Sequence, residues 1–318
     1  MRFAIFLLTA TLSIAGEFTT SLGDIYPYTI SAITTDSSGN TYVVGNRQLG
    51  AFPTAISIAG QATLDELVDP FGSGGSDVFV TKLDPNGKIL FTDTFAGKGV
   101  DSGNAIAVDP SGNIYIAGTT TSSDFPLSKA LQTQPNTTYG TGFIIKLSND
   151  GSTILYSTYF GGMLGQTFFT SIATDPSGNL FLTGATGAAD FPHTAGMPSG
   201  PSGAILVSIS AAGDKILYSG VLPGGPIPVA GDYNIGTGGV SVAVDAAGNA
   251  YFGGNSSANN LPTTPGVLAP TGSFTGFLAK VNATAISLSY LTYLPSHVYT
   301  MAVDAAGNAY LPGFRQGQ

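Results

Sequence analysis

The sequence predicts an all-β protein made of repeated four-stranded antiparallel units, which is the pattern of a β-propeller. A short phrase of the type Asp-x-x-Gly-Asn occurs five times, at spacings of 73, 66, 70 and 59 residues. Apolar residues alternate around each copy, and helical periodicity is nearly absent, with one possible turn at 63–68. The chain holds 44 glycines and 19 prolines in 318 residues, which favours short strands and tight turns.

The repeated phrase is part of a longer repeated sequence pattern, which we call the ruler. Positions in the ruler are counted from the Asp of the phrase. Gly follows at +3, Asn at +4, an aromatic residue at +6 and Gly at +9, while a large aliphatic residue or Met stands at −3. Phe-Pro or Leu-Pro follows at +16 in the first four copies. The Asp side chain can accept backbone N–H bonds inside a turn and Gly can adopt a positive φ, so each copy predicts a β-hairpin. The five Asp residues are Asp36, Asp109, Asp175, Asp245 and Asp304.

A second hairpin follows each of the first four copies, at 77–95, 141–160, 202–222 and 275–294. The first three have turn glycines at Gly87, Gly151 and Gly213, and the fourth has lost its glycine. Each unit therefore holds four strands, A to D. The segment 17–36 resembles 156–175, which predicts a D-like strand before the first A strand. Grouped as D-A-B-C, the units give four whole blades and a fifth that lacks strand C.

The segment SGNAIAVDPSGNIYIAGTTTSSDFPLSKALQ at 102–132, followed by GFIIKLSNDGSTILYSTYFGG at 142–162, resembles the SBBP repeat. The hairpin phrase is also similar to NHL-type propeller repeats. The resemblance covers nearly the whole chain after the N-terminus, and it implies a bacterial β-propeller scaffold of secreted and surface proteins without a defined activity. The chain has fewer units than family propellers, so we expect either a small or open propeller or a truncated product. An open edge would expose apolar blade faces and invite self-association.

The N-terminus has the pattern of a secretory signal peptide. One Arg precedes an apolar stretch from Phe3 to Leu12, and small residues stand at Ser13 and Ala15. We therefore expect a signal peptide at 1–15, a propeller domain at 16–318, and a secreted or cell-envelope protein, periplasmic or extracellular. A buried first strand is the alternative. No later apolar run is long enough to span a membrane.

Composition excludes several classes of function. The net charge is −9, so phosphate backbones would be repelled and nucleic acid is not expected as a partner. The chain has no cysteine, which rules out disulfides and thiolate metal sites. We predict no cofactor.

Candidates for chemistry are few. His193 and His297 have no counterparts in other units. The simplest interpretation is that both are surface positions where the sequence varies without a functional role. The five turn Asp residues supply one carboxylate per loop, which favours a turn role over calcium binding. Asp65, Asp69 and Asp77 form the one local acidic group, and they predict either a loop-borne cation site or, more simply, a solvated loop.

Two further sets of residues repeat from unit to unit. Lys82, Lys146 and Lys280 occupy matching places in strand C and are predicted to face solvent at a blade edge. Aromatic residues recur in the D strands, where we expect core packing; stacking on sugars or gripping a protein partner is the alternative. They are Tyr156, Tyr159, Phe160, Tyr218, Tyr290 and Tyr293.

These observations predict an exported, non-enzymatic scaffold that binds an unknown protein or glycan, with specificity in variable B–C loops such as 119–141. We assign no catalytic, cofactor or metal residue. One alternative is a lyase or hydrolase acting on polysaccharide or lactone at the propeller hub, which would be favoured if both histidines and several Asp residues converged in one pocket. Another is a fragment of a larger propeller without independent function.

Overall fold

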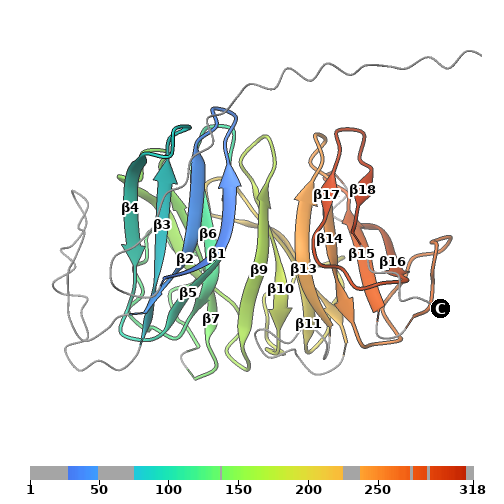
Figure 1. Cartoon of the computed structure of the whole chain (residues 1–318). Coiled ribbons are helices and arrows are strands. Elements are labelled where there is room, and N and C mark those ends of the chain that lie inside the picture. Colours follow the sequence, from blue (N-terminus) through green and yellow to red (C-terminus); the bar gives the residue numbers. More distant parts are fainter. Residues whose placement is uncertain are drawn as a thin grey trace, which may run out of the picture.

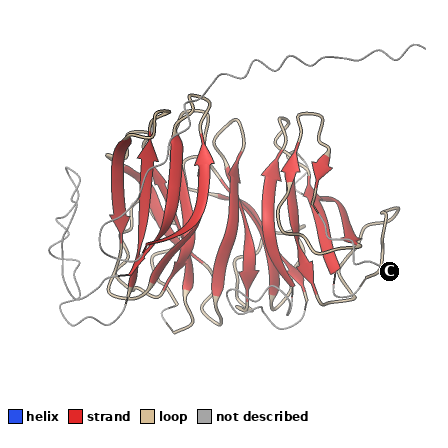
Figure 2. Ribbon diagram, viewed as in Figure 1, coloured by secondary structure: helices blue, strands red, loops and turns tan. Residues whose placement is uncertain are grey.

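The computed structural model describes residues 28–48, 75–136, 138–224, 237–272, 275–284 and 287–312. Every regular element in these ranges is a β-strand (Figure 2). They contain no helix that could cross a membrane. The predicted signal peptide, the D-like segment before residue 28 and the possible helical turn at 63–68 lie outside the described residues.

The strands form four four-stranded antiparallel sheets and one two-stranded sheet, which we call blades 1 to 4 and the half-blade. Blade 1 contains β1 (Tyr28–Thr35), β2 (Thr41–Gln48), β3 (Ser76–Leu83) and β4 (Ile89–Phe95). Blade 2 contains β5 (Asp101–Val108), β6 (Ile114–Thr120), β7 (Thr141–Leu147) and β8 (Ile154–Phe160). Blade 3 contains β9 (Thr167–Thr174), β10 (Leu180–Thr186), β11 (Gly203–Ile209) and β12 (Ile216–Pro223). Blade 4 contains β13 (Thr237–Val244), β14 (Ala250–Ser256), β15 (Thr275–Val281) and β16 (Leu288–Leu294), and the half-blade contains β17 (Ala302–Val303) and β18 (Ala309–Tyr310).

The hydrogen-bonded order in each sheet is A-B-C-D, so the predicted D-A-B-C grouping is wrong. Strand D closes the sheet of its own unit, as β8 pairs with β7 and β12 with β11. Four complete units and a partial fifth are confirmed, and the partial unit consists of strands A and B. Figure 1 shows blades 1 and 2 on the left, blade 3 in the middle, and blade 4 with the half-blade on the right.

The Asp-x-x-Gly-Asn phrase forms the predicted A–B turn in all five copies. The Gly N–H donates to the Asp carbonyl at 2.8 to 3.1 Å, as Gly112 does to Asp109. The turn glycines have φ between 79° and 82°. A residue with a side chain would be strained in this conformation. The same conformation recurs at the C–D turn glycines, including Gly151 with a φ of 75°.

The glycine at +9 permits a bulge between strands A and B. Pairing shifts register between Gly103 and Ala105, opposite Gly118. A Cβ at Gly118 would collide with the carbonyl oxygen of Ser102. Strand A therefore approaches strand B too closely for any other residue at this position.

The blades pack face to face around a common axis. The first strands contact one another in succession, from β1 to β5, β9, β13 and β17, so strand A is the innermost strand of each blade. Each blade has a front face, which covers the next blade, and a rear face, which covers the preceding one. The residue at −3 lies on the rear face: Ile106 is buried in one cluster with Tyr42 and Val80 of blade 1. Consequently both faces of a blade are apolar.

The Phe-Pro element leads a segment that covers the outer edge of strand D. Phe125 is buried and stacks on Phe143 with ring centroids 4.6 Å apart. After it, Ser128 and Ser157 exchange two backbone hydrogen bonds, of 3.0 and 2.7 Å. Blades 3 and 4 repeat this arrangement at β12 and β16. In blades 2 to 4 the B–C segment thus occupies the edge that would otherwise offer unpaired backbone groups.

Replacing Ile106 with Ala should lower the free energy of unfolding by about 3 kcal/mol, because it leaves a cavity between two blades. Ile33 holds the same ruler position in blade 1 but is 66% exposed, so Ile33→Ala should change stability by less than about 0.5 kcal/mol. Urea unfolding of the dilute protein measures both. Equal losses for the two variants would contradict the proposed packing.

Candidate axial binding site

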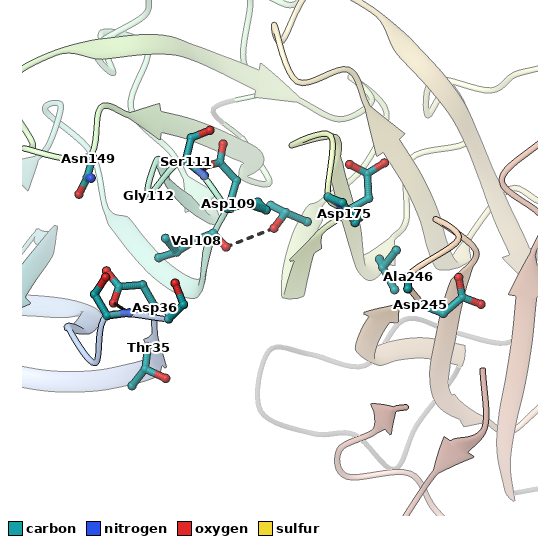
Figure 3. A pocket seen from close by; sticks show the side chains of 16 residues that line it. Thr35, Asp36, Val108, Asp109, Ser111, Gly112, Asn149, Asp175, Asp245 and Ala246 are labelled. Carbon is teal, nitrogen blue, oxygen red and sulfur yellow. Dashed lines mark hydrogen bonds between the residues drawn. The ribbon is translucent and has the colours of Figure 1, made fainter. Parts of the chain in front are cut away.

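A pocket of about 520 Å³ opens at the end of the axis where the A–B turns meet. Its wall combines four successive turns with one C–D turn of blade 2 (Figure 3). Ser37, Ser38 and Ser111 contribute hydroxyls, and Pro110 and Pro176 contribute apolar edges. The Thr174 hydroxyl donates to the Val108 carbonyl at 3.3 Å and joins two neighbouring blades at the pocket wall.

Each pocket Asp is engaged in its own turn. In Asp109, Oδ1 accepts the backbone N–H groups of Ser111 and Asn113, both at 2.9 Å. Oδ2 accepts the Asn113 side-chain amide at 2.8 Å and lies 3.2 Å from the Tyr115 hydroxyl. The same bonds to +2 and +4 recur at Asp36, Asp175 and Asp245. These carboxylates serve the backbone, so the predicted turn role is confirmed.

Lys82, Lys146 and Lys280 do not face solvent, and the predicted orientation is wrong. Lys82 and Lys146 are each only 7% exposed. The Lys146 ammonium lies 4.7 Å from the ring centre of Tyr115, 3.5 Å from the Asp109 carboxylate and 2.9 Å from the Ala211 carbonyl of blade 3. Both sheet faces are covered by neighbouring blades, so alternation along strand C placed this side chain between two blades instead of in water.

The lysine, the tyrosine at +6 and the turn Asp form what we call the Asp–Tyr–Lys clamp. The Tyr115 hydroxyl shares its one proton between Asp109 and the Gly178 carbonyl of blade 3, which is nearer at 2.6 Å. Blade 4 repeats the contact, with the Tyr251 hydroxyl 2.9 Å from the Gly307 carbonyl. The clamp therefore links one blade to the turn of the next. Three blades have such a clamp: Asp36, Tyr42 and Lys82 in blade 1; Asp109, Tyr115 and Lys146 in blade 2; and Asp245, Tyr251 and Lys280 in blade 4.

Burial and the bonds of the clamp shift the pKa values of Tyr115, Lys146 and Asp245. Burial raises the pKa of Tyr115, and the neighbouring Tyr156 and Asp109 raise it further. Burial lowers the pKa of Lys146, while Asp109 opposes that change. Burial alone would raise the pKa of Asp245, but hydrogen bonds from Asn249 and Tyr251 outweigh it and hold this pKa below its ordinary value. At neutral pH the carboxylate is thus charged and already bonded.

Blade 3 lacks the clamp, because Phe181 and Ser208 stand where the other blades have Tyr and Lys. In the described part of the chain the buried hydroxyls of Ser208 and Tyr218 have no hydrogen-bond partner. The contact between blades 3 and 4 instead combines apolar packing, which includes Tyr218 against Phe252, with hydrogen bonds between β9 and β13, such as the one from the Thr170 hydroxyl to the Gly239 carbonyl at 2.8 Å. Asp175 still lines the pocket with its turn bonds intact.

The other candidate residues do not join this pocket. His193 lies in the B–C segment of blade 3, where Nε2 is 2.9 Å from the Met197 carbonyl, and His297 lies between β16 and β17. Neither histidine lines the pocket wall.

Asp77 is not part of a solvated loop. It belongs to β3, is 4% exposed and pairs across the sheet with Arg47. Burial raises its pKa to about 7, with Asp101 adding to the shift and Arg47 opposing it. Asp65 and Asp69 lie outside the described residues, among which no three His, Cys, Asp or Glu side chains gather as a metal site.

The aromatic residues of the D strands pack in the core, as predicted. Tyr290 is partly buried, and the other five are at most 5% exposed: Tyr156, Tyr159, Phe160, Tyr218 and Tyr293. The Tyr159 hydroxyl donates to the Ser122 carbonyl at 2.8 Å and accepts the Phe125 N–H at 3.1 Å, so it anchors the B–C segment. These five rings are therefore too deeply buried to stack on a sugar.

Two segments, 95–126 and 155–192, match the SBBP profile, described as a β-propeller repeat. Each begins in the outer strand of one blade and ends at the Phe-Pro element of the next. The predicted SBBP repeat is thereby confirmed, and the likeness to NHL repeats stays a prediction. No curated protein matches the sequence.

Solved structures similar to the chain include other propellers. The β-propeller domain of Myceliophteria thermophila Cps50 (Swd1) has 9% identity and a TM-score of 0.44, with 92% of this chain and 62% of that chain covered. The Dos1 propeller has 9% identity and a TM-score of 0.42, with coverage of 89% and 65%. A Dyadobacter fermentans protein of unknown function has 9% identity and a TM-score of 0.41, with coverage of 86% and 71%. The chain spans less than two thirds of the length of the Cps50 (Swd1) and Dos1 propellers.

Replacing Asp109 with Ala should lower the free energy of unfolding by about 3 kcal/mol, because it removes the turn bonds and leaves Lys146 buried without its anion. Asp304→Ala removes the same turn bonds from an exposed turn and should have a much smaller effect. Urea unfolding of the two variants compares them directly. Equal losses would mean that the clamp adds nothing to the turn.

Proposed function

We propose that the chain is an exported, non-catalytic β-propeller that binds a protein or glycan ligand at its axial pocket. The observation that carries the proposal is the pocket wall of turn backbone, hydroxyls and small residues, in which the carboxylates are already bonded. A catalytic hub would need acids and bases free to exchange protons with a substrate. The lyase or hydrolase alternative would be favoured by both histidines at the pocket, and neither lines it.

Of the two ligand classes, a glycan unit suits the pocket better. Its volume falls within the range of small-molecule sites, roughly 300 to 1,000 Å³. The hydroxyls of Ser37, Ser38 and Ser111 can exchange hydrogen bonds with sugar hydroxyls. None of the described residues of its wall is aromatic, so we expect modest affinity without stacking.

Titration of the purified chain against a panel of soluble glycans should show binding without cleavage. Ser111→Arg places a long side chain in the pocket and should weaken binding at least about tenfold, because it occupies the ligand's space. Thr133→Arg, in the B–C segment and away from the pocket wall, adds the same charge and should bind like the unchanged protein.

Chromatography of the incubated glycans separates this proposal from the enzyme alternative, since released fragments would indicate a lyase or hydrolase. Equal weakening by both Arg variants, or binding to a protein alone, would contradict the axial glycan site.

Export rests on the sequence pattern at residues 1–15. In a bacterial host the full chain should be recovered outside the cytoplasm with Gly16 as its first residue, as intact mass would show. Ala15→Phe should block cleavage, because the position before the cut requires a small side chain. Ala10→Phe, within the apolar stretch, should be processed normally. Cytoplasmic protein that retains Met1 would contradict export.

A further inference from the structure

Blade 1 exposes the rear-face position that every later blade buries. Ile33 is 66% exposed, and its neighbour on the same strand, Ile30, is 57% exposed. The matching residues of the later units are between 6% and 8% exposed: Ile106, Ile172, Val242 and Met301. Among the described residues, no front face therefore lies against the face of β1 that carries Ile33.

The half-blade exposes the opposite side of the same contact. Tyr310 holds the +6 position and is 56% exposed, although its hydroxyl donates to Asp304 at 2.9 Å as in the other turns. Its equivalents on the front faces of the four blades are at most 4% exposed: Tyr42, Tyr115, Phe181 and Tyr251. Within the part of the chain that the structure describes, no rear face thus covers the front face at Tyr310 as one covers its equivalents.

These two positions meet wherever two blades meet in the chain. The +6 aromatic residue of one blade and the −3 residue of the next share a core cluster four times: Tyr42 with Ile106, Tyr115 with Ile172, Phe181 with Val242, and Tyr251 with Met301. A polar contact accompanies two of the pairs, from the Tyr115 hydroxyl to Gly178 and from the Tyr251 hydroxyl to Gly307. The exposed Tyr310 and Ile33 are the two halves of a fifth such contact.

We propose that a second copy of this chain supplies the missing half, so that the β1 rear face of one copy docks on the β17–β18 front face of another. The occupant follows from the four contacts already made in the chain, whose geometry this interface repeats. Ile33 would enter the position that Met301 occupies against Tyr251, and the Tyr310 hydroxyl would reach the carbonyl of Gly39 in the second copy. The contact is head-to-tail, so it extends the assembly or closes a ring.

The charge of the chain predicts how salt acts on this contact. Each copy carries a net charge of −9, so two copies repel each other at low ionic strength. The joining faces are apolar, so screening of the repulsion should strengthen association. An interface held by surface ion pairs would weaken instead.

Light scattering after size exclusion, on the full chain over a range of concentrations, tests the proposal. The unchanged protein should assemble beyond the 32.2 kDa monomer. Ile33→Glu and Tyr310→Glu should each weaken association at least about tenfold, because each buries an unpaired charge in the contact. Leu268→Glu alters an apolar residue that is 85% exposed and lies on neither face, and it should assemble normally. Thermal unfolding confirms that the variants fold, which their exposed positions predict.

Mixing the two disruptive variants gives the decisive result. The Ile33→Glu protein keeps an intact front face and the Tyr310→Glu protein keeps an intact rear face, so an equimolar mixture should form dimers and nothing larger. A monomeric unchanged protein, full assembly by either variant alone, or a monomeric mixture would each overturn the proposal.

Discussion

The contact between the front face of one blade and the rear face of the next is the constraint on which the rest of the structure depends. A single four-stranded sheet of this composition has two apolar faces and cannot cover both by itself. Stacking the sheets around an axis covers both faces of every inner blade with copies of the same surface. The ruler repeats because of this contact: the +6 aromatic residue of one blade packs against the −3 residue of the next blade at each boundary. The Asp at its origin fixes the turn that sets the register of strands A and B within each blade.

The polar groups near the axis follow from the same contact. A tyrosine hydroxyl and a lysine ammonium between two sheets need partners, and the turn Asp together with the carbonyls of the next blade supplies them. The carboxylates that a reader of the sequence might assign to a metal or a reaction are thereby occupied in holding the hub together. The pocket wall is left with backbone, hydroxyls and proline edges, which suit binding better than proton transfer.

Local chemistry predicted the hairpins, because Asp, Gly and Asn define the turn within five residues of one another. It did not predict which four strands form one sheet. In a repeated sequence the unit can be counted from strand A or from strand D, and only the hydrogen-bonded order of the strands distinguishes the two groupings. The lysines of strand C were predicted to face solvent because they alternate with apolar residues. Such alternation separates the two faces of a strand but does not show whether another blade covers each face. Asp77 was assigned to a loop for a related reason: its burial depends on the pairing of β3 with β2 across a long insertion. The axial pocket required the turns of four blades, from Thr35 to Ala246, to be brought together in space.

Hydrogen–deuterium exchange, followed by mass spectrometry of the dilute chain, tests most directly whether covered blade faces stabilise the fold. If they do, amides of β6, β10 and β14, which lie in blades covered on both faces, should exchange slowest. Those of β1 and of β17–β18, which carry the exposed Ile33 and Tyr310, should exchange fastest among the strands. Protection of β1 equal to that of its equivalents β5, β9 and β13 would contradict the account.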